Sequence, residues 1–180
     1  STNAMLTLLR VRDSDEPPVT EEEVGVLLEQ GARAGVFLPA EREMTERVFD
    51  LADDRVAALM TPRPEVTWID VEKSPEDIAR LVLESPFSRF PVGSGTLDNL
   101  LGIISVKELL IHLKDGTLKL PDQFREPLIF PESMMALRSL ERFRQTGEHL
   151  AVVIDEYGGT AGILSITDIL EALVGDLPEP

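Results

Sequence analysis

The chain has 180 residues, enough for one ordinary domain or two small domains that share a core. Its composition, 43% hydrophobic and 28% charged, is that of a globular protein rather than a disordered one. A net charge of −16 argues against a nucleic-acid partner and against docking on anionic lipid, because both require a basic surface. The chain contains no cysteine, which excludes disulfides, thiolate metal sites and a cysteine nucleophile.

The start of the chain differs from the rest. Its first five residues read as the remnant of an expression tag, and we predict a disordered lead-in over residues 1–19. Thr20 is followed by three glutamates, which is a capping box that begins a helix. Apolar residues at three-to-four spacing predict a second helix over about residues 39–55. Residues 20–58 are therefore expected to form a helical linker.

Strands alternating with helices are predicted over residues 59–118. A strand is expected at residues 66–70, and Ser74, followed by proline and two acids, is a strong helix start. Two further strands, residues 90–92 and 100–104, should be joined by a glycine-rich turn. A closing helix is expected to bury its leucines and to end at a glycine. These residues are Leu109, Leu110, Leu113 and Gly116.

The same order recurs over residues 119–176, and residues 177–180 form a tail. Ile129 is expected to begin a short strand, and Ser133 to cap a helix that Gly147 ends. The buried face of that helix should carry Met134, Leu137 and Leu140. The remaining predicted elements are a strand, a turn, a second strand and a last helix, at residues 150–154, 157–159, 161–164 and 166–173.

An internal repeat is visible residue by residue. Residues 101–110 align with residues 161–170 at a constant offset of sixty positions. Each half reads strand, helix, strand, strand, helix, and two units this small can hide their sheets only by packing on each other. We therefore predict an α+β fold, with two βαββα repeats packed as a pseudo-twofold pair and preceded by the helical linker.

Both repeats carry the pattern Gly-x-x-Ser-x-x-acid where a strand becomes a helix. The residues are Gly102, Ser105 and Glu108, and then Gly162, Ser165 and Asp168. A glycine in a strand allows another group to approach closely. The serine and the first free N–H groups of the helix suit a phosphate, and the acid one turn later can accept hydrogen bonds from both hydroxyls of a ribose. The same residues also make capping boxes that need no ligand, so a nucleotide site and a structural cap both remain open.

Longer motifs carry a family resemblance. Residues 56–62 end in Met-Thr-Pro, residues 88–92 read Ser-Arg-Phe-Pro-Val, and residues 149–160 contain Asp-Glu-Tyr-Gly-Gly-Thr. With the tandem βαββα order, these motifs resemble the CBS-domain (Bateman) pairs of the CorC/HlyC hemolysin-like and CNNM family, over about residues 21–175. The resemblance implies a regulatory module from the cytosolic part of a membrane protein implicated in magnesium and cobalt efflux. The chain would then be a soluble fragment that lacks its partner, the membrane domain.

The resemblance also implies a ligand, AMP or ATP with or without magnesium, bound in the cleft between the repeats. Carried over by position, the residues of this site are Thr61, Phe87, Arg89, Leu150, Ser165 and Asp168. Asp168 would hold the ribose hydroxyls, and Ser165 a phosphate or ribose oxygen. Phe87 and Arg89 would flank the base and the phosphates, Thr61 would lie beside the adenine, and Leu150 would add an apolar wall.

A second candidate nucleotide site contains Ser105 and Glu108, where glutamate replaces the family's usual aspartate. The histidines, His112 and His149, have no acidic ligands at metal spacing, and no metal site is expected. The leading hypothesis is a nucleotide-binding homodimer without enzymatic activity. A structural dimerisation module with empty pockets is the alternative. A hydrolase is a weaker hypothesis, because the repeated motif contains no histidine or lysine to act as a base.

Overall fold

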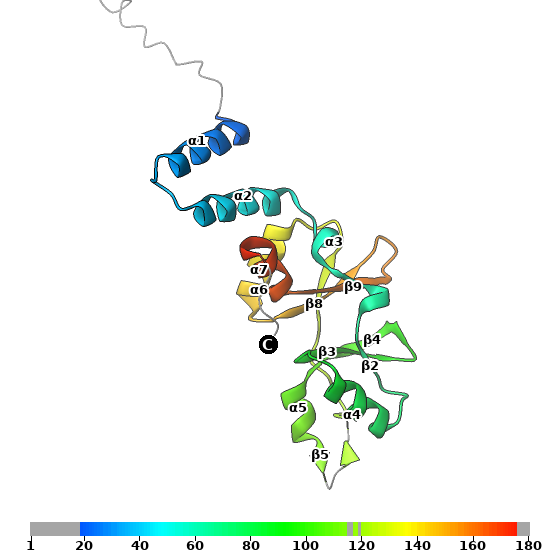
Figure 1. The fold of residues 1–180 in the computed structure, drawn as a ribbon. Coiled ribbons are helices and arrows are strands. Elements are labelled where there is room, and N and C mark those ends of the chain that lie inside the picture. The colour runs from blue at the N-terminus through cyan, green and yellow to red at the C-terminus, as the bar shows by residue number, and fades with distance from the viewer. Residues whose placement is uncertain (1–18, 115–116, 119, 176–180) are drawn as a thin grey trace, which may run out of the picture. The chain divides into compact units, whose positions relative to one another are not determined.

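A computed structural model describes the chain (Figure 1) over residues 19–114, 117–118 and 120–175. The chain divides into two compact units, Ser1–Glu43 and Met44–Pro180, and the boundary lies within helix α2 (Pro39–Asp53). The expected disordered lead-in and the tail lie outside the described residues, apart from Val19 at the end of the lead-in.

The two helices predicted before the repeats are both present. Helix α1 (Glu21–Arg33) begins at a capping box, in which the Glu23 N–H donates to the Thr20 hydroxyl at 3.3 Å and the Thr20 N–H donates to the Glu23 carboxylate at 3.2 Å. The helix ends shortly before Gly35, whose φ of 75° is the left-handed conformation that glycine adopts freely. Helix α2 follows and buries Leu51 in the core of the second unit.

Both repeats have the predicted order, β2-α4-β3-β4-α5 and then β7-α6-β8-β9-α7. The first repeat and the segments around it consist of α3 (Val56–Leu59), β1 (Thr61–Pro62), the 3₁₀ helix η1 (Arg63–Glu65), β2 (Ile69–Asp70), α4 (Pro75–Glu84), β3 (Arg89–Ser94), β4 (Thr96–Ser105), α5 (Val106–Ile111), β5 (Leu113–Lys114) and β6 (Thr117–Leu118). The second repeat consists of β7 (Leu128–Pro131), α6 (Ala136–Thr146), β8 (Leu150–Ile154), β9 (Thr160–Ser165) and α7 (Ile166–Val174).

Each repeat is completed by a segment that precedes the other one. The main sheets have the strand orders β2-β3-β4 and β1-β9-β8-β7. Strand β1 leads into the first repeat but pairs with β9 of the second, where Thr61 lies opposite Ile163. In the reverse sense Arg125, which precedes the second repeat, bridges to Ile103 of β4. This exchange ties the repeats together through backbone hydrogen bonds.

The repeated glycines make room for the exchanged segments. A Cβ on Gly102 would lie 2.5 Å from Cβ of Phe124 and 2.6 Å from the carbonyl oxygen of Arg125. A Cβ on Gly162 would collide in the same way with the carbonyl oxygen of Thr61. The sequence predicted a close approach at these glycines, and the approaching group is the protein's own backbone.

Two apolar clusters form the core, one in each repeat. The cluster of the first repeat consists of Ile69, Ile78, Phe90, Val92, Ile104 and Leu109. The cluster of the second repeat also includes residues from α2 and α3, and it consists of Leu51, Val56, Phe130, Ala136, Phe143, Ala151, Val153, Leu164 and Ile169. Phe130 and Phe143 meet edge to face with ring centroids 5.2 Å apart. The helices α4 and α5 flank one sheet, and α6 and α7 flank the other (Figure 1).

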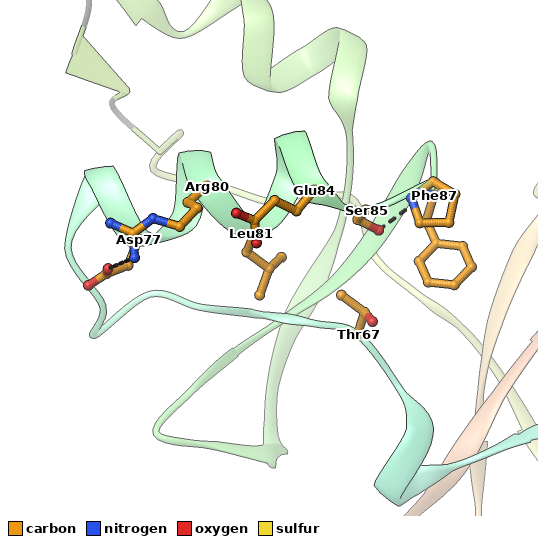
Figure 2. Close-up of a pocket in the computed structure, with 8 residues that line it drawn as sticks. Thr67, Asp77, Arg80, Leu81, Glu84, Ser85 and Phe87 are labelled. Atoms are coloured by element: carbon orange, nitrogen blue, oxygen red, sulfur yellow. Dashed lines mark hydrogen bonds and ion pairs between the residues drawn. The ribbon is translucent and has the colours of Figure 1, made fainter.

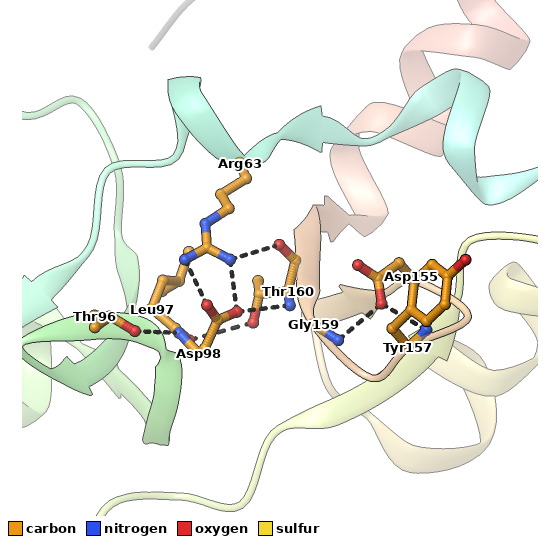
Figure 3. A network of polar contacts seen from close by, with 8 residues as sticks. All are labelled: Arg63, Thr96, Leu97, Asp98, Asp155, Tyr157, Gly159 and Thr160. Carbon is orange, nitrogen blue, oxygen red and sulfur yellow. Dashed lines mark hydrogen bonds and ion pairs between the residues drawn. The ribbon is translucent and has the colours of Figure 1, made fainter.

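A polar link joins the β3–β4 hairpin to the second repeat (Figure 3). Arg63 donates to both carboxylate oxygens of Asp98, at 2.6 and 2.7 Å. Asp98 also accepts from the N–H of Thr160 at 2.9 Å, at the start of β9. These bonds lower the pKa of Asp98, with the Arg63 side chain as the largest cause. The link therefore holds η1, β4 and β9 together beside the exchanged strand β1.

Several local predictions were wrong. The strand expected at residues 66–70 is only Ile69–Asp70. Ser133 does not cap a helix, because the backbone of residues 132–134 is bonded to the start of α3 and to Arg55, so that α6 begins later, after Met135. Of the residues expected to be buried, Leu110 is 64% exposed and Leu137 is 37% exposed. The side chain of Leu113 and all of Gly116 lie outside the described residues.

Candidate functional site

One pocket of about 420 Å³ is lined by all of the residues expected at the main nucleotide site. They come from β1, from the segment that enters β3, from the first residue of β8 and from the β9–α7 junction. The predicted residues on its wall are Thr61, Phe87, Arg89, Leu150, Ser165 and Asp168. The structure thus brings together side chains that are far apart in the sequence.

The entry segments of β3 and β8 face the pocket because each is held by the helix that follows its hairpin. The Val106 N–H donates to the carbonyl of Ser88, and the Ile166 N–H donates to the carbonyl of His149, both at 3.0 Å. The strand register agrees, since Leu150 lies opposite Ser165. Phe87 and Arg89, on either side of Ser88, are thereby presented at the same opening.

Asp168 is half-buried at this junction and forms the expected capping box with Ser165. Its Oδ2 accepts from the Ser165 N–H at 2.7 Å, and its own N–H donates to the Ser165 hydroxyl oxygen at 3.1 Å. Among the described residues, Oδ1 of Asp168 has no hydrogen-bond partner. Burial raises the pKa of Asp168, and the bonds from Ser165 offset part of this effect. One carboxylate oxygen therefore holds the helix while the other can accept from a ligand.

The charges on the pocket wall are mostly acidic. Glu65, Asp168 and Glu171 contribute carboxylates, and Arg89 is the one arginine among the lining residues. His149 also lies on the wall, a position that was not predicted from the sequence. Two signals in the sequence could have identified these residues. His149 directly precedes Leu150, and Glu171 lies one helical turn after Asp168. A bare polyphosphate would meet net repulsion here.

A neighbouring hollow of about 370 Å³ shares Phe87, Pro86 and Thr67 with the pocket and extends along α4 (Figure 2). Phe87 is 52% exposed, and its backbone N–H donates to the Ser85 hydroxyl at 3.2 Å. An exposed aromatic ring on a fixed backbone is suited to stacking against a planar ligand.

The second candidate site is arranged differently. Ser105 and Glu108 also form a capping box, but there the Ser105 N–H and hydroxyl both donate to Oε2 of Glu108, at 2.8 and 2.7 Å. The remaining oxygen, Oε1, accepts from Arg125 at 2.8 Å. The bonds from Ser105, followed by the one from Arg125, lower the pKa of Glu108 to about 2.

Within the described part of the chain, no group of His, Asp and Glu side chains is arranged to hold a metal ion. In the same residues, none of the helices has the length and apolar composition needed to cross a membrane.

Comparison with known proteins gives consistent matches. The family model "CBS domain" matches residues 56–115 and 124–175. The UPF0053 protein sll0260 of Synechocystis is 44% identical over 99% of this chain and 40% of its own length. The polyamine export protein of Escherichia coli K12 is 35% identical over 88% of this chain and 36% of its own length.

Solved structures match as well. The CBS domain of the bacterial CNNM/CorC family Mg²⁺ transporter is 33% identical, with a TM-score of 0.78 over 89% of this chain and 99% of that one. Its complex with ATP is 34% identical, with a TM-score of 0.71 over 77% of this chain and 100% of that one. A CBS-domain pair with bound AMP from Klebsiella pneumoniae is 26% identical, with a TM-score of 0.57 over 67% of this chain and 98% of that one. The chain thus spans whole solved CBS domains but only about two fifths of the length of the curated relatives.

Proposed function

Because the chain belongs to the CBS-domain family, as a tandem pair of the kind found in CNNM/CorC Mg²⁺ transporters and hemolysin-like proteins, we propose that it binds an adenine nucleotide in the pocket around Asp168 and thereby regulates a membrane transporter. It is a regulatory domain and not a catalytic one. The observation that carries the proposal is the half-buried Asp168, whose Oδ2 caps α7 while Oδ1 is free to accept from a ribose.

The rest of the pocket suits the remaining parts of a nucleotide. The exposed ring of Phe87 can stack on the base, which contributes about 1–3 kcal/mol per base in comparable sites. Arg89 and His149 also line the pocket and would donate to a phosphate. The N-terminus of α7, at Ser165, adds the positive end of a helix dipole.

We propose further that a triphosphate enters with a divalent cation. Glu65 and Glu171 would repel a bare polyphosphate, whereas Mg²⁺ is commonly held in proteins by one or two carboxylates together with substrate phosphates. AMP carries less charge and should depend less on the cation. Replacing both glutamates by glutamine should therefore allow ATP to bind without magnesium.

A thermal-shift titration tests these points. At a ligand concentration of a hundred times Kd, binding adds about 2.7 kcal/mol of stability. For a protein of this size that corresponds to a rise in Tm of roughly 5–11 °C. We expect AMP and magnesium–ATP to give the shift, and ATP with EDTA to give a smaller one. No shift with any nucleotide would favour the structural dimerisation module instead.

We also propose that two modules associate as a homodimer through their helices. Helix α4 exposes Leu83 (85%), and α5 exposes Leu110 and Ile111 (64% and 68%), an apolar surface that a twofold interface would cover. Light scattering at micromolar concentration gives the mass directly, and Leu83→Glu should shift it toward the monomer. A monomeric wild type at tens of micromolar would contradict the proposal.

The membrane domain of a longer parent protein is the remaining proposed partner. Two of the relatives are named as an Mg²⁺ transporter and a polyamine export protein, and both of these substrates are cations. We therefore propose that the nucleotide state of this module regulates cation transport by the parent. The test is transport by the full-length protein with and without an intact Asp168.

A further inference from the structure

The nucleotide pocket has a counterpart related to it by the pseudo-twofold axis of the repeats. The pairing of Thr61 with Ile163 is matched by that of Arg125 with Ile103. The hydrogen bond that places His149 beside α7 is matched by the one that places Ser88 beside α5. These matches locate the positions that correspond to Thr61, Phe87 and Asp168.

The residues at the counterpart positions differ in chemistry. Arg125 occupies the position of Thr61, and Glu148, which precedes His149 as Phe87 precedes Ser88, occupies the position of Phe87. Glu108 takes the place of Asp168. A small polar group and an aromatic ring are thus replaced by a cation and an acid.

These charged side chains meet one another. Nη2 of Arg125 lies 2.8 Å from Oε1 of Glu108, and Nη1 of Arg125 lies 3.7 Å from Oε1 of Glu148. With Oε2 of Glu108 bonded to Ser105, both oxygens of this carboxylate have partners, unlike those of Asp168. Glu148 would also repel a phosphate where Phe87 offers a stacking surface. We call this set of three charged residues the Arg125 clamp.

We infer that the Arg125 clamp is a built-in occupant of the counterpart position, so that Arg125 bridges the two repeats there and the chain binds a single nucleotide, at Asp168. Glu108 belongs to α5 of the first repeat, and Glu148 directly precedes β8 of the second. The Arg125 side chain then holds the repeats together at the counterpart position, and only the pocket at Asp168 responds to ligand. The stoichiometry part of this inference rests on the proposed function.

The clamp is measured first without nucleotide. The Tm values of Arg125→Gln, Glu108→Gln and the double variant are compared with that of wild type. Either single substitution already removes the interaction between the two side chains, so their effects on stability should not add. The partly exposed pair should give a non-additivity of roughly 1–3 °C in Tm. Strict additivity would overturn the clamp whatever the nucleotide does, so this result is independent of the proposed function.

Calorimetric titration of AMP, which avoids the cation dependence, then tests the stoichiometry. Wild type should bind about one AMP per chain, and two would overturn the inference. Asp168→Ala should weaken this binding roughly tenfold to a few hundredfold. Adding Arg125→Thr, Glu148→Phe and Glu108→Asp to that variant transfers the first pocket's residues to the counterpart position and should restore about one AMP per chain.

The control adds Arg144→Thr, an exposed arginine on α6, to Asp168→Ala and should restore nothing. If the rebuilt protein melts cooperatively but binds no AMP, the clamp is not what closes the counterpart position, and the inference fails.

Discussion

Replacing Gly162 by alanine should break the strand exchange between the repeats. The new Cβ would lie under 3.0 Å from the carbonyl oxygen of Thr61, and a backbone atom cannot move aside as a flexible side chain can. Overpacking of this kind costs about 1–3 kcal/mol, and each backbone hydrogen bond lost between β1 and β9 adds about 0.5–1.5 kcal/mol. The free energy of unfolding should therefore fall by about 2–4 kcal/mol, equivalent to a fall in Tm of roughly 4–16 °C.

Urea unfolding followed by circular dichroism measures this loss. Gly25→Ala is the matched control, because Gly25 lies in α1 with no atom within 4 Å of a new Cβ. That substitution should leave stability unchanged or raise it by about 0.5–1 kcal/mol, since alanine is the better helix former. Since Thr61 lines the nucleotide pocket, Gly162→Ala should also weaken nucleotide binding. An unfolding free energy within about 0.5 kcal/mol of wild type would refute the account of the exchange.

Three further predictions follow from single groups. Phe87→Ala should weaken adenine-nucleotide binding by roughly tenfold or more, with little change in Tm because the residue is 52% exposed. Phe87→Tyr should retain affinity, and isothermal titration and melting separate the effects on binding and on stability. Asp98→Asn should lower Tm because it weakens the hydrogen bonds to Arg63 and Thr160. The difference in Tm from wild type should be smaller in high salt, and a Tm equal to that of wild type at low salt would contradict this prediction. The folded pKa of Glu108, about 2, lies below its ordinary 4.5, so its stabilising contribution is present above pH 4.5 and is lost as the pH falls toward 2. Wild type should therefore lose more stability than Glu108→Gln over that range, and parallel pH–Tm curves would contradict the assignment.

The sequence was most informative where the signal is local or repeated. The capping residues Thr20 and Ser74 begin the helices expected of them, and the sixty-residue repeat predicted the order of both halves. Carrying the family motifs over by position selected residues that all line one pocket. Local backbone preference and a repeated motif are properties of short segments, which is why they can be read without the fold.

Features that depend on distant segments were not predicted. Nothing near Thr61 in the chain indicates that it pairs with Ile163, about a hundred residues away, and the glycine that permits this pairing resembles a ligand-binding glycine. Ser133 has the composition of a helix cap, but its neighbours bond to α3 instead. Arg125 received no role because its contacts with Glu108 and Glu148 exist only once the repeats are packed.

The central claim is that the free oxygen of Asp168 holds a nucleotide, and Asp168→Asn tests it most directly. Asparagine can still accept from the Ser165 N–H and cap α7, but its amide nitrogen donates where the carboxylate accepted. The loss of charged hydrogen bonds worth about 1.5–3 kcal/mol each should weaken AMP and magnesium–ATP roughly tenfold to a few hundredfold in calorimetric titration. Glu108→Gln, the matched change in the counterpart cap, should leave affinity unchanged. A lowered Tm with unchanged nucleotide affinity in Asp168→Asn would mean that Asp168 is only a helix cap, and would contradict the proposed site.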